Sequence, residues 1–337
     1  MITIIGAGLG GLALAQGLMR RGHACQVLEQ DADASSRAQG FRISLNALGR
    51  EALRELLPPE RHARILATEA KVGRRFAFAR TPARALLEFD ADAWTVCRPL
   101  LRAILAEDVP IRWGTPVETP PEGELVVGAD GVGSRVRAWL SARTTVPEVF
   151  DTGVTNIAGY VLRTRAWEGR LPLNARGAVQ YLGPEGQTLF VSFCERDDRT
   201  PMVLWALSAR GEAVTPAPGW HPVLQELMQN PTERGRIRSS RFNVPKQRLH
   251  AGVTLLGDAA HAMPPQRGLG GNNAFEDARL LCARLDDIGA YEREMFTRAK
   301  VAIEESEEAA QLMHLRNPIT RGLRNAALAI GGRFASR

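Results

Sequence analysis

The start of the chain alternates short apolar runs with a longer helix-forming stretch. Residues 2–5 are a β-branched run that suits a buried parallel strand, and residues 12–21 have the composition of a helix that ends at Gly22. Residues 23–28 then predict a second strand. Strand, helix and strand in this order predict a βαβ unit at the N-terminus.

Apolar spacing predicts further elements downstream. Residues 45–57 and 99–105 place their apolar positions on one face of a helix. Residues 124–127 and 253–256 are apolar runs typical of buried strands, and both lead into a Gly-x-Asp or Gly-Asp sequence. Acidic residues directly after buried strands are candidates for ligand binding, because ligands of parallel sheets bind at the carboxyl ends of the strands.

The middle and the end of the chain have different patterns. Between residues 151 and 207, strand-like segments alternate with Gly and Pro turns, at 159–163, 178–182, 188–194 and 202–207. We expect an inserted, largely antiparallel sheet there. From Asn272 onward the chain is helical in pattern, with expected breaks at Gly289 and at Asn317-Pro318.

Composition indicates an ordinary globular chain. With 337 residues and 45% apolar content it can bury a full core, in two closely joined domains or one large one. The net charge of +6 comes from arginines that are spread along the chain. No basic run interleaved with aromatic residues occurs, so we expect no nucleic-acid partner.

Cysteine and histidine spacing predicts no metal site. The four cysteines lack CxxC pairs and indicate reduced, cytoplasmic thiols, and the histidines show no metal-ligand spacing. No uninterrupted apolar run reaches about 18 residues, so we expect no membrane span. The apolar N-terminus lacks a basic leader and is interrupted by glycines, which assigns it to the fold rather than to a signal peptide.

The segment Gly6-x-Gly8-x-x-Gly11 has the spacing of a dinucleotide-binding loop. Gly6 permits a tight turn, Gly8 lets the backbone approach a pyrophosphate, and Gly11 allows a helix to pack closely on a strand. Glu29 ends the second strand, about 20 residues beyond the loop, where a carboxylate binds ribose hydroxyls and disfavours a 2′-phosphate. NADP is therefore not expected at this site, and NAD and FAD both remain possible.

Two later segments combine glycines with an aspartate. Residues 128–137 have the sequence Gly-Ala-Asp-Gly-Val-Gly-Ser-Arg-Val-Arg. Residues 256–265 have the sequence Leu-Gly-Asp-Ala-Ala-His-Ala-Met-Pro-Pro, and residues 268–272 continue as Gly-Leu-Gly-Gly-Asn. These segments resemble the DGxxSxxR and GD fingerprints of the class A FAD monooxygenases, the para-hydroxybenzoate hydroxylase type of aromatic hydroxylase. The resemblance favours FAD over NAD.

The resemblance extends beyond these fingerprints. It includes residues 40–47, Arg98 at the start of a helix, residues 274–278 and residues 291–293. It covers the nucleotide-binding parts well and residues 151–250 only loosely. It implies an α/β fold with a Rossmann-like FAD-binding domain, an inserted, mostly antiparallel β-sheet substrate domain and C-terminal helices. The expected division is an FAD-binding domain of residues 1–70, 97–150 and 250–290, a substrate domain of 71–96 and 151–249, and a C-terminal helical segment of 291–337.

Individual roles follow from the resemblance. It implies that Asp258 binds a ribityl hydroxyl of FAD, that Arg98 contacts the FAD backbone, and that Asp130 bears on both FAD and nicotinamide binding. A helix N-cap, a surface arginine and a turn carboxylate are the respective structural alternatives. It also implies that backbone N–H groups at the start of the last helical region face the pyrimidine edge of the flavin, from Gly268, Gly270, Gly271 and Asn272.

The resemblance also implies a mechanism. NADPH or NADH would reduce FAD, and O2 would form a flavin C4a-hydroperoxide that hydroxylates an aromatic or polyketide-like small molecule. Pro264, Pro265 and Gly268 would lie against the reacting flavin edge without acid-base roles. A dehydrogenase or oxidase without oxygen insertion and a non-catalytic flavin-binding protein are the alternatives. The sequence does not indicate the oligomeric state of the protein.

Some residues that look chemical have structural interpretations. His261 follows the GD motif, but the flavin carries the chemistry, so we expect a structural hydrogen-bonding histidine. Five residues of the expected inserted sheet face either a pocket or the core, and core packing is favoured for each of them: Tyr160, Gln180, Phe190, Ser192 and Trp205.

Overall fold

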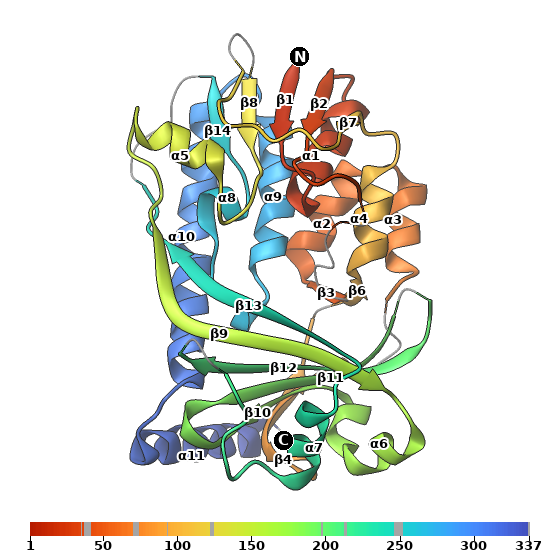
Figure 1. Cartoon of the computed structure of the whole chain (residues 1–337), viewed down its shortest axis with the longest axis vertical. Coiled ribbons are helices and arrows are strands. Elements are labelled where there is room, and N and C mark those ends of the chain that lie inside the picture. The colour runs from red at the N-terminus through yellow and green to blue at the C-terminus, as the bar shows by residue number, and fades with distance from the viewer. Residues whose placement is uncertain are drawn as a thin grey trace. The chain divides into compact units, whose positions relative to one another are not determined.

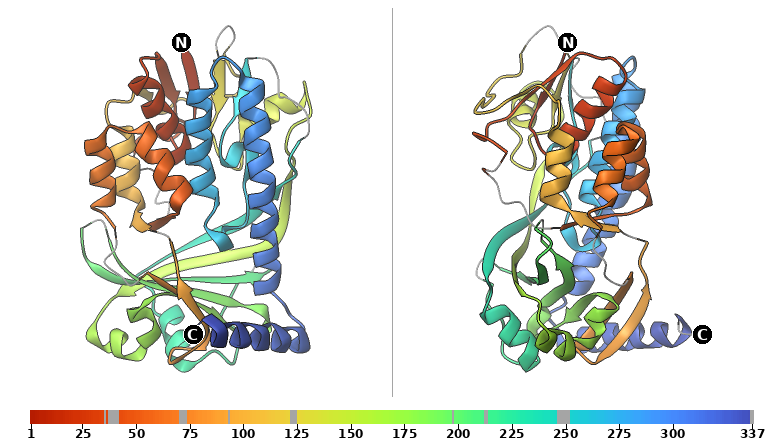
Figure 2. Two further views of the ribbon diagram at one scale, coloured as in Figure 1. Left: turned by 180° about the vertical axis from the view of Figure 1, so that it is seen from behind. Right: turned by 90° about the vertical axis from the view of Figure 1, so that its right-hand side faces the viewer.

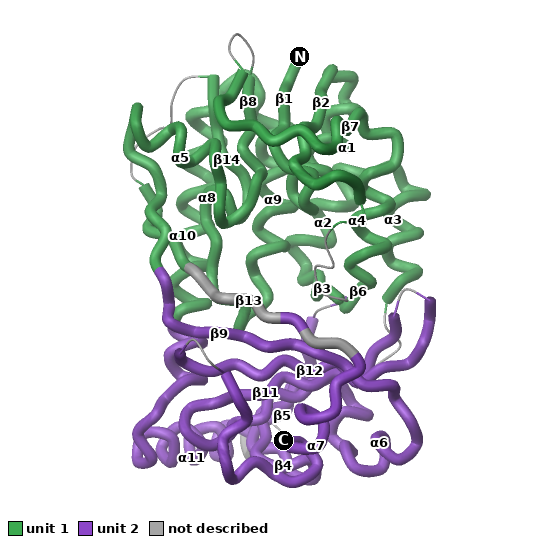
Figure 3. Tube along the Cα trace, in the orientation of Figure 1, with its two compact units in different colours: residues 1–69, 95–150, 240–307 green, residues 70–94, 151–239, 308–337 purple. Residues whose placement is uncertain are grey.

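The computed structural model describes residues 1–34, 36, 42–69, 74–92, 94–121, 125–196, 198–211, 214–245 and 252–335. Gly40 and Phe41 of the family-like segment, Glu124 of an expected strand, and the expected domain boundaries at 70, 71 and 250 lie outside these residues. The chain forms two compact units (Figure 3), which are unit 1, residues 1–69, 95–150 and 240–307, and unit 2, residues 70–94, 151–239 and 308–337.

Unit 1 is built on a five-stranded sheet, and each pair of neighbouring strands is parallel. The strand order is β14 (Val253–Leu255), β8 (Leu125–Gly128), β1 (Ile2–Ile5), β2 (Cys25–Leu28) and β7 (Ile111–Arg112). Ile4 pairs with Val27 on one side and Val127 on the other, so the β-branched run of the N-terminus is central. Apolar strands covered on both faces are typical of parallel sheets. The expected α/β class is confirmed.

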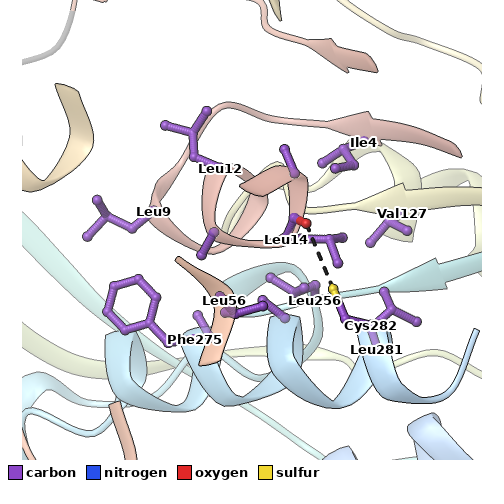
Figure 4. Packing of buried hydrophobic residues seen from close by; sticks show 14 of the residues in the cluster. Ile4, Leu9, Leu12, Leu14, Leu56, Val127, Leu256, Phe275, Leu281 and Cys282 are labelled. Atoms are coloured by element: carbon purple, nitrogen blue, oxygen red, sulfur yellow. Dashed lines mark hydrogen bonds between the residues drawn. The ribbon is translucent and has the colours of Figure 1, made fainter. Parts of the chain in front are cut away.

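Helices of unit 1 pack on this sheet or on one another (Figures 1 and 2). They are α1 (Leu9–Arg20), α2 (Ala47–Leu56), α3 (Pro59–Leu66), α4 (Arg98–Ala106), α5 (Arg135–Ser141), α8 (Asp258–His261), α9 (Gly270–Ala283) and the first part of α10 (Ile288–Met313). Figure 4 shows the contact of α1 and α9, where Leu14 lies over Cys282 and the Cys282 thiol is 3.9 Å from the Leu14 carbonyl oxygen. Each fully buried leucine of this layer contributes about 1.5–3 kcal/mol.

The boundaries of three helices differ from those expected. Helix α1 begins at Leu9, because Gly8 is the N-cap and the following glycines adopt helical backbone. The expected break at Gly289 is wrong. Helix α9 ends at Ala283, and α10 starts at Ile288 and runs through Gly289, since the Asp287 carboxylate accepts a hydrogen bond from Ala290 N at 2.9 Å and caps it. The break before α11 (Pro318–Ala335) is confirmed.

The helix expected over residues 45–57 begins two residues later, because Leu45 ends a short strand. β3 (Arg42–Leu45) pairs with β6 (Trp94–Cys97) in a two-stranded sheet. The Asn46 side chain then accepts a hydrogen bond from Gly49 N at 3.0 Å, so α2 starts at Ala47. Local capping chemistry, rather than apolar spacing, decides where this helix begins.

Unit 2 contains a seven-stranded sheet. Its order is β13 (Glu233–Phe242), β9 (Val149–Leu162), β12 (Pro201–Arg210), β11 (Thr188–Glu195), β10 (Gly177–Leu182), β4 (Arg75–Thr81) and β5 (Arg84–Asp90). Neighbouring strands are antiparallel from β9 through β12 and β11 to β10, and β4 is antiparallel to β5. Strands β10 and β4 are parallel. The expected inserted, mostly antiparallel sheet is confirmed. The strands β4 and β5 were not predicted.

One face of the seven-stranded sheet supports the core of unit 2. Alternate residues of the strands, such as Val191, Phe193 and Trp205, pack with apolar residues of α7 (Pro222–Gln229) and of the 3₁₀ helix η1 (Pro172–Ala175). The short helix α6 (Arg165–Arg170) and helix α11 also belong to unit 2. The opposite face of the same strands therefore has a separate set of side chains.

The domain division expected from the sequence remains a prediction. The compact units differ from it most at the C-terminal end, where residues up to 307 belong to unit 1 and residues 308–337 belong to unit 2. Helix α10 contributes to both units. The apolar periodicity of α10 predicts which face of the helix is buried. It does not predict that two different units cover that face, so the division within α10 was not expected.

Candidate functional site

The glycine loop has the geometry that its spacing predicts. Gly6 has φ +110°, and a Cβ built there would lie 2.5 Å from the Ala129 carbonyl oxygen. A Cβ at Gly11 would lie 2.2 Å from the Gly6 carbonyl oxygen. These two glycines are required by the protein itself, for the turn and for helix-strand packing. At Gly8, by contrast, a Cβ would meet only the Ala129 oxygen, at 3.9 Å, so the space beside Gly8 is open.

The N-terminus of α1 is suited to an anion. Its N-cap Gly8 has no side chain to accept from the first N–H groups, and no acidic residue occurs in the first turn. The unpaired N–H groups and the positive end of the helix dipole therefore favour a negatively charged group. The open space at Gly8 lies beside this helix end.

Glu29 supports the loop directly. Its carboxylate accepts hydrogen bonds from Ala7 N at 2.6 Å and from Asp31 N at 2.9 Å. The side chain is only 7% exposed. Sequence reasoning anticipated a ribose contact and did not anticipate that Glu29 holds the glycine loop against the end of β2.

Two arginines of α4 lie one turn apart. Arg98 begins the helix and is half-buried, and burial lowers the pKa of its guanidinium while Asp258 opposes that shift. Arg102 was missed in the sequence analysis. Its guanidinium donates to the carbonyl oxygens of Ala7 at 3.1 Å and Ala34 at 2.7 Å. The i, i+4 spacing from Arg98 places both on one face of α4 and was the available signal.

Asp258 follows β14 and begins the short helix α8. Its side chain is exposed to solvent, yet the protein around it displaces enough water to raise the pKa of the carboxyl group. His261 and Arg98 oppose this increase. A solvent-accessible carboxylate in such surroundings, at the end of a parallel strand, is suited to binding ligand hydroxyls.

Asp277 of α9 holds the loop that carries Asp258. The buried carboxylate of Asp277 accepts from Gly257 N at 2.9 Å and from His261 Nε2 at 2.6 Å, and it also pairs with Arg298. Asp277 raises the pKa of His261 against the effect of burial, and His261 and Arg298 lower the pKa of Asp277. The expected structural role of His261 as a hydrogen-bonding histidine is confirmed.

The second fingerprint, residues 128–137, contacts both the glycine loop and the segment that contains Asp258. Asp130 accepts from Arg135 N at 2.7 Å through one oxygen, which caps α5, while its other oxygen is buried without a partner. Arg137 donates to the carbonyl oxygens of Val132 at 2.6 Å and of Ala259 at 2.8 Å, next to Asp258. One oxygen of Asp130 therefore has the structural role of a turn carboxylate, and the other oxygen is available to a ligand.

The start of α9 is a second helix end without a side-chain cap. Gly268 has φ +65°, in the left-handed region, and no acidic residue lies in the first turn of α9. A Cβ at Gly270 would be 3.7 Å from Asp258 Oδ1, whereas a Cβ at Gly271 would be 2.7 Å from Ile43 Cδ1. Gly270 is therefore beside Asp258, and Gly271 is explained by packing on β3.

Asn272 has a structural role that the sequence analysis did not predict. Its buried amide donates to the carbonyl oxygens of Ser44 and Gly268, both at 2.9 Å, and accepts from Asn46 N at 3.1 Å. The side chain is 1% exposed. The Asn272 amide is fully committed to the backbone and joins the start of α9 to the loop before α2.

The remaining site residues precede Gly268. Pro264 is buried, and Pro265 is exposed at the start of the 3₁₀ helix η3 (Pro265–Arg267). Unit 1 therefore brings together the glycine loop, Asp130, Arg98, Asp258 and the start of α9. Two uncapped helix ends, an open space beside Gly8 and an unpartnered Asp130 oxygen fit a dinucleotide with acidic phosphates and polar hydroxyls.

Neither a metal-binding cluster nor a membrane-spanning helix occurs in the part of the chain that the structure describes. No group of three or more His, Cys, Asp or Glu side chains there is placed to hold a metal ion. No helix there combines the length and apolar character needed to cross a membrane.

Comparisons with known proteins agree with this site. Residues 122–288 match the FAD binding domain family, and residues 4–54 match the NAD(P)-binding Rossmann-like domain family. The chain is 28% identical over 344 residues to the FAD-dependent monooxygenase thnD of Trichoderma harzianum, covering 85% of this chain and 83% of that protein. It is 26% identical over 338 residues to 6-hydroxynicotinate 3-monooxygenase of Pseudomonas fluorescens, covering 87% and 84%.

A solved structure shows the same fold. HpxO of Klebsiella pneumoniae, determined with FAD and uric acid, superposes with a TM-score of 0.79 at 22% identity, over 100% of this chain and 95% of that one. At this identity the likeness bears on the fold. It agrees with the arrangement of a parallel nucleotide-binding sheet and a largely antiparallel second sheet in one chain.

Proposed function

The chain belongs to the class A FAD-dependent monooxygenases, and on this premise we propose that it inserts one oxygen atom of O2 into an aromatic or polyketide-like small molecule with NADPH or NADH as reductant. The observation that carries the proposal is that three fingerprints lie together in unit 1. Gly6 packs on Ala129, Arg137 bonds Ala259, and Gly270 lies beside Asp258. The monooxygenases among its relatives support the reaction class.

The roles proposed for the cofactor site follow from its geometry. The N-terminus of α1 at Gly8 binds the pyrophosphate, and Glu29 uses its remaining lone pairs for ribose hydroxyls. Asp258 binds a ribityl hydroxyl, and Arg98 offsets nearby negative charge. The N–H groups at the start of α9 face the pyrimidine edge of the flavin, and Asn272 contributes there only through its backbone.

The protein's own contribution is binding and positioning. When bound, FAD accepts reducing equivalents from the nicotinamide and activates O2 for oxygen transfer. Pro264 and Pro265 form a rigid, donor-free segment before Gly268, which shapes the wall of the site and excludes water without any acid-base role. The start of α9, which has no side-chain cap and no acidic residue in its first turn, would favour negative charge on a bound flavin through its dipole.

The second face of the sheet in unit 2 is the proposed substrate surface. Strand register places five residues in a row across β4, β10, β11, β12 and β9: Phe78, Gln180, Phe190, Ala206 and Ala158. Their sequence neighbours point into the core of unit 2, so this row lies on the other face. Two aromatic rings, one amide and two small side chains suit a flat ring that carries a polar substituent.

A neighbouring row extends this surface. Register aligns Ser192, Leu204 and Tyr160, and the Tyr160 hydroxyl accepts from Arg196 Nη1 at 2.9 Å. Core packing was the favoured expectation for these sheet residues, and it is confirmed for Trp205, which belongs to the core of unit 2. Tyr160 and Ser192 are buried on the opposite face instead.

The test uses FAD-loaded protein, NADPH or NADH, ¹⁸O2, and a panel of phenols, indoles and polyketide-like aromatics. We expect a true substrate to raise NAD(P)H consumption above the basal rate and to gain one labelled oxygen. A parallel reaction with unlabelled O2 in H2¹⁸O should give unlabelled product. Product that carries no ¹⁸O and forms anaerobically with another electron acceptor would contradict oxygen insertion and favour the dehydrogenase alternative.

A further inference from the structure

Unit 2 contains a cavity of ≈ 260 Å³ that the proposed monooxygenase reaction does not use. It lies between the start of α11 and the loops around residues 183–184 and 219–221. Its lining includes three arginines, Arg80, Arg321 and Arg324, together with His221, and none of its lining residues is acidic. The volume suits a small ligand or one group of a larger ligand rather than a flavin.

The guanidinium groups at this cavity have different roles. Arg324 is structural, because it donates to the carbonyl oxygens of Leu312 and Met313 at 2.9 and 3.0 Å and to the Asn325 amide oxygen. Arg321 Nε is buried without a hydrogen-bond partner in the described part of the chain, and the exposed Arg80 meets no carboxylate in the cavity lining. His221 Nδ1 is likewise buried without a partner. Polar nitrogen atoms without a partner, the Arg321 Nε donor among them, therefore lie around this cavity.

The charges of these arginines act on one another. Arg80 and Arg321 both lower the pKa of Arg324, beyond the larger effect of burial. Like charges gathered in a partly buried place are unfavourable unless an anion offsets them. Arginine side chains also present paired donors that match the oxygens of phosphate and carboxylate groups.

We propose that this cavity is a second ligand site, separate from the FAD site, which binds a small oxyanion through Arg80 and Arg321. The group bound is a phosphate or a carboxylate. Arg324 holds the end of α10 and contributes positive charge, and His221 and Trp220 line the side opposite α11. Trp220 is held in place by its Nε1 donating to Gln187 Oε1 at 2.9 Å, so that wall is rigid.

The test is titration calorimetry with inorganic phosphate on FAD-loaded protein in chloride buffer, because FAD then occupies the pyrophosphate site of unit 1. We expect saturable binding of one phosphate. Arg321→Gln and Arg80→Gln should each weaken it at least about tenfold, which corresponds to ~1.4 kcal/mol. Neither variant alters the carbonyl contacts of Arg324 or the flavin site, so flavin content should not change.

Arg165→Gln is the matched control, since Arg165 is an exposed arginine of α6 outside the cavity lining. It should bind phosphate as the unaltered protein does. Competition by acetate would assign the site to carboxylates as well, and failure of acetate to compete would assign it to phosphates. The proposal is overturned if phosphate gives no saturable heat, or if Arg321→Gln and Arg80→Gln bind it as tightly as Arg165→Gln.

Discussion

His261 Nε2 donates a hydrogen bond of 2.6 Å to the Asp277 carboxylate, and both side chains are fully buried. The same carboxylate accepts from Gly257 N, so the pair fixes the loop that presents Asp258. The loop at the end of β14 therefore depends on an ion pair between His261 of α8 and Asp277 of α9. This relationship makes stability and cofactor binding experimentally separable at this site.

His261→Gln should destabilise the protein by about 3 kcal/mol, because it leaves part of a buried charge uncompensated. Arg298 still pairs with Asp277, which keeps the loss moderate. The measurement is urea unfolding of the apoprotein. His23→Gln is the control, since His23 is exposed, and it should be neutral. Equal stability of the two variants would contradict the anchoring role.

The contribution of His261 should depend on pH. Its pKa in the folded state is raised above 6.5, so its stabilisation is full below pH 6.5 and is lost as pH rises through the folded value. The pKa of Asp277 is lowered below 3.8, so its stabilisation is present above 3.8 and is lost as pH falls through the folded value. The stability difference between the unaltered protein and His261→Gln should therefore be largest between pH 3.8 and 6.5. A difference that grows at alkaline pH would contradict the assignment.

Gly8→Val should abolish flavin retention while leaving the apoprotein folded. The backbone at Gly8, with φ −74° and ψ 174°, accepts an L-residue, and the protein leaves space for the side chain that the pyrophosphate would otherwise occupy. Absorbance of bound flavin and circular dichroism measure the two effects. Gly169→Val is the control, because nothing lies within 4 Å of a Cβ there. Retained flavin in Gly8→Val would show that the dinucleotide lies elsewhere.

Asp258→Ala should weaken FAD binding about 10-fold to 100-fold, as expected for the loss of one or two hydrogen bonds to a charged group. The apoprotein should not lose stability, since the protein around Asp258 already displaces water that would stabilise this charge. Fluorescence titration of apoprotein with FAD measures the affinity. Asp286→Ala removes an exposed carboxylate of the same unit and should leave the affinity unchanged. Unaltered affinity in Asp258→Ala would exclude its proposed ribityl contact.

Asn272→Ala should cost about 3 kcal/mol of unfolding free energy. It removes three hydrogen bonds and leaves the Ser44 and Gly268 carbonyl oxygens without their donor. Urea unfolding measures the loss. Asn230→Ala, which removes one long exposed hydrogen bond, serves as the control. A neutral Asn272→Ala would mean that the start of α9 is held by other contacts.

Phe190→Ala tests the proposed substrate surface. With a substrate identified by oxygen labelling, KM should rise about tenfold, which corresponds to ~1.4 kcal/mol, while flavin content stays constant. Val149→Ala changes an exposed apolar residue at the start of β9, outside the row, and should not alter KM. Reduced flavin content in Phe190→Ala, or an unchanged KM, would count against this surface.

Several features of the site were predictable because they are local. The roles of Gly6 and Gly11 follow from a strand, a turn and a helix that are consecutive in sequence, and the structure confirms both contacts. The role of Asn272 was not predictable, because its partners Ser44 and Asn46 lie more than two hundred residues away. The spacing of Arg102 from Arg98 indicated a shared helix face, but its contacts were not predictable, since Ala7 and Ala34 become its partners only after the chain folds.

The amino-acid sequence by itself determined the nucleotide-binding βαβ unit, the order of the fingerprints and the antiparallel character of the inserted sheet. These depend on apolar periodicity and on glycines that a turn requires. Tertiary structure decided which polar side chains serve the fold and which remain open to a ligand. Glu29 and Asp277 each accept hydrogen bonds that hold a loop of the site in place, whereas Asp130 keeps one oxygen unpaired. That distinction exists only in three dimensions, because a buried polar atom is satisfied by whatever donor the fold brings to it.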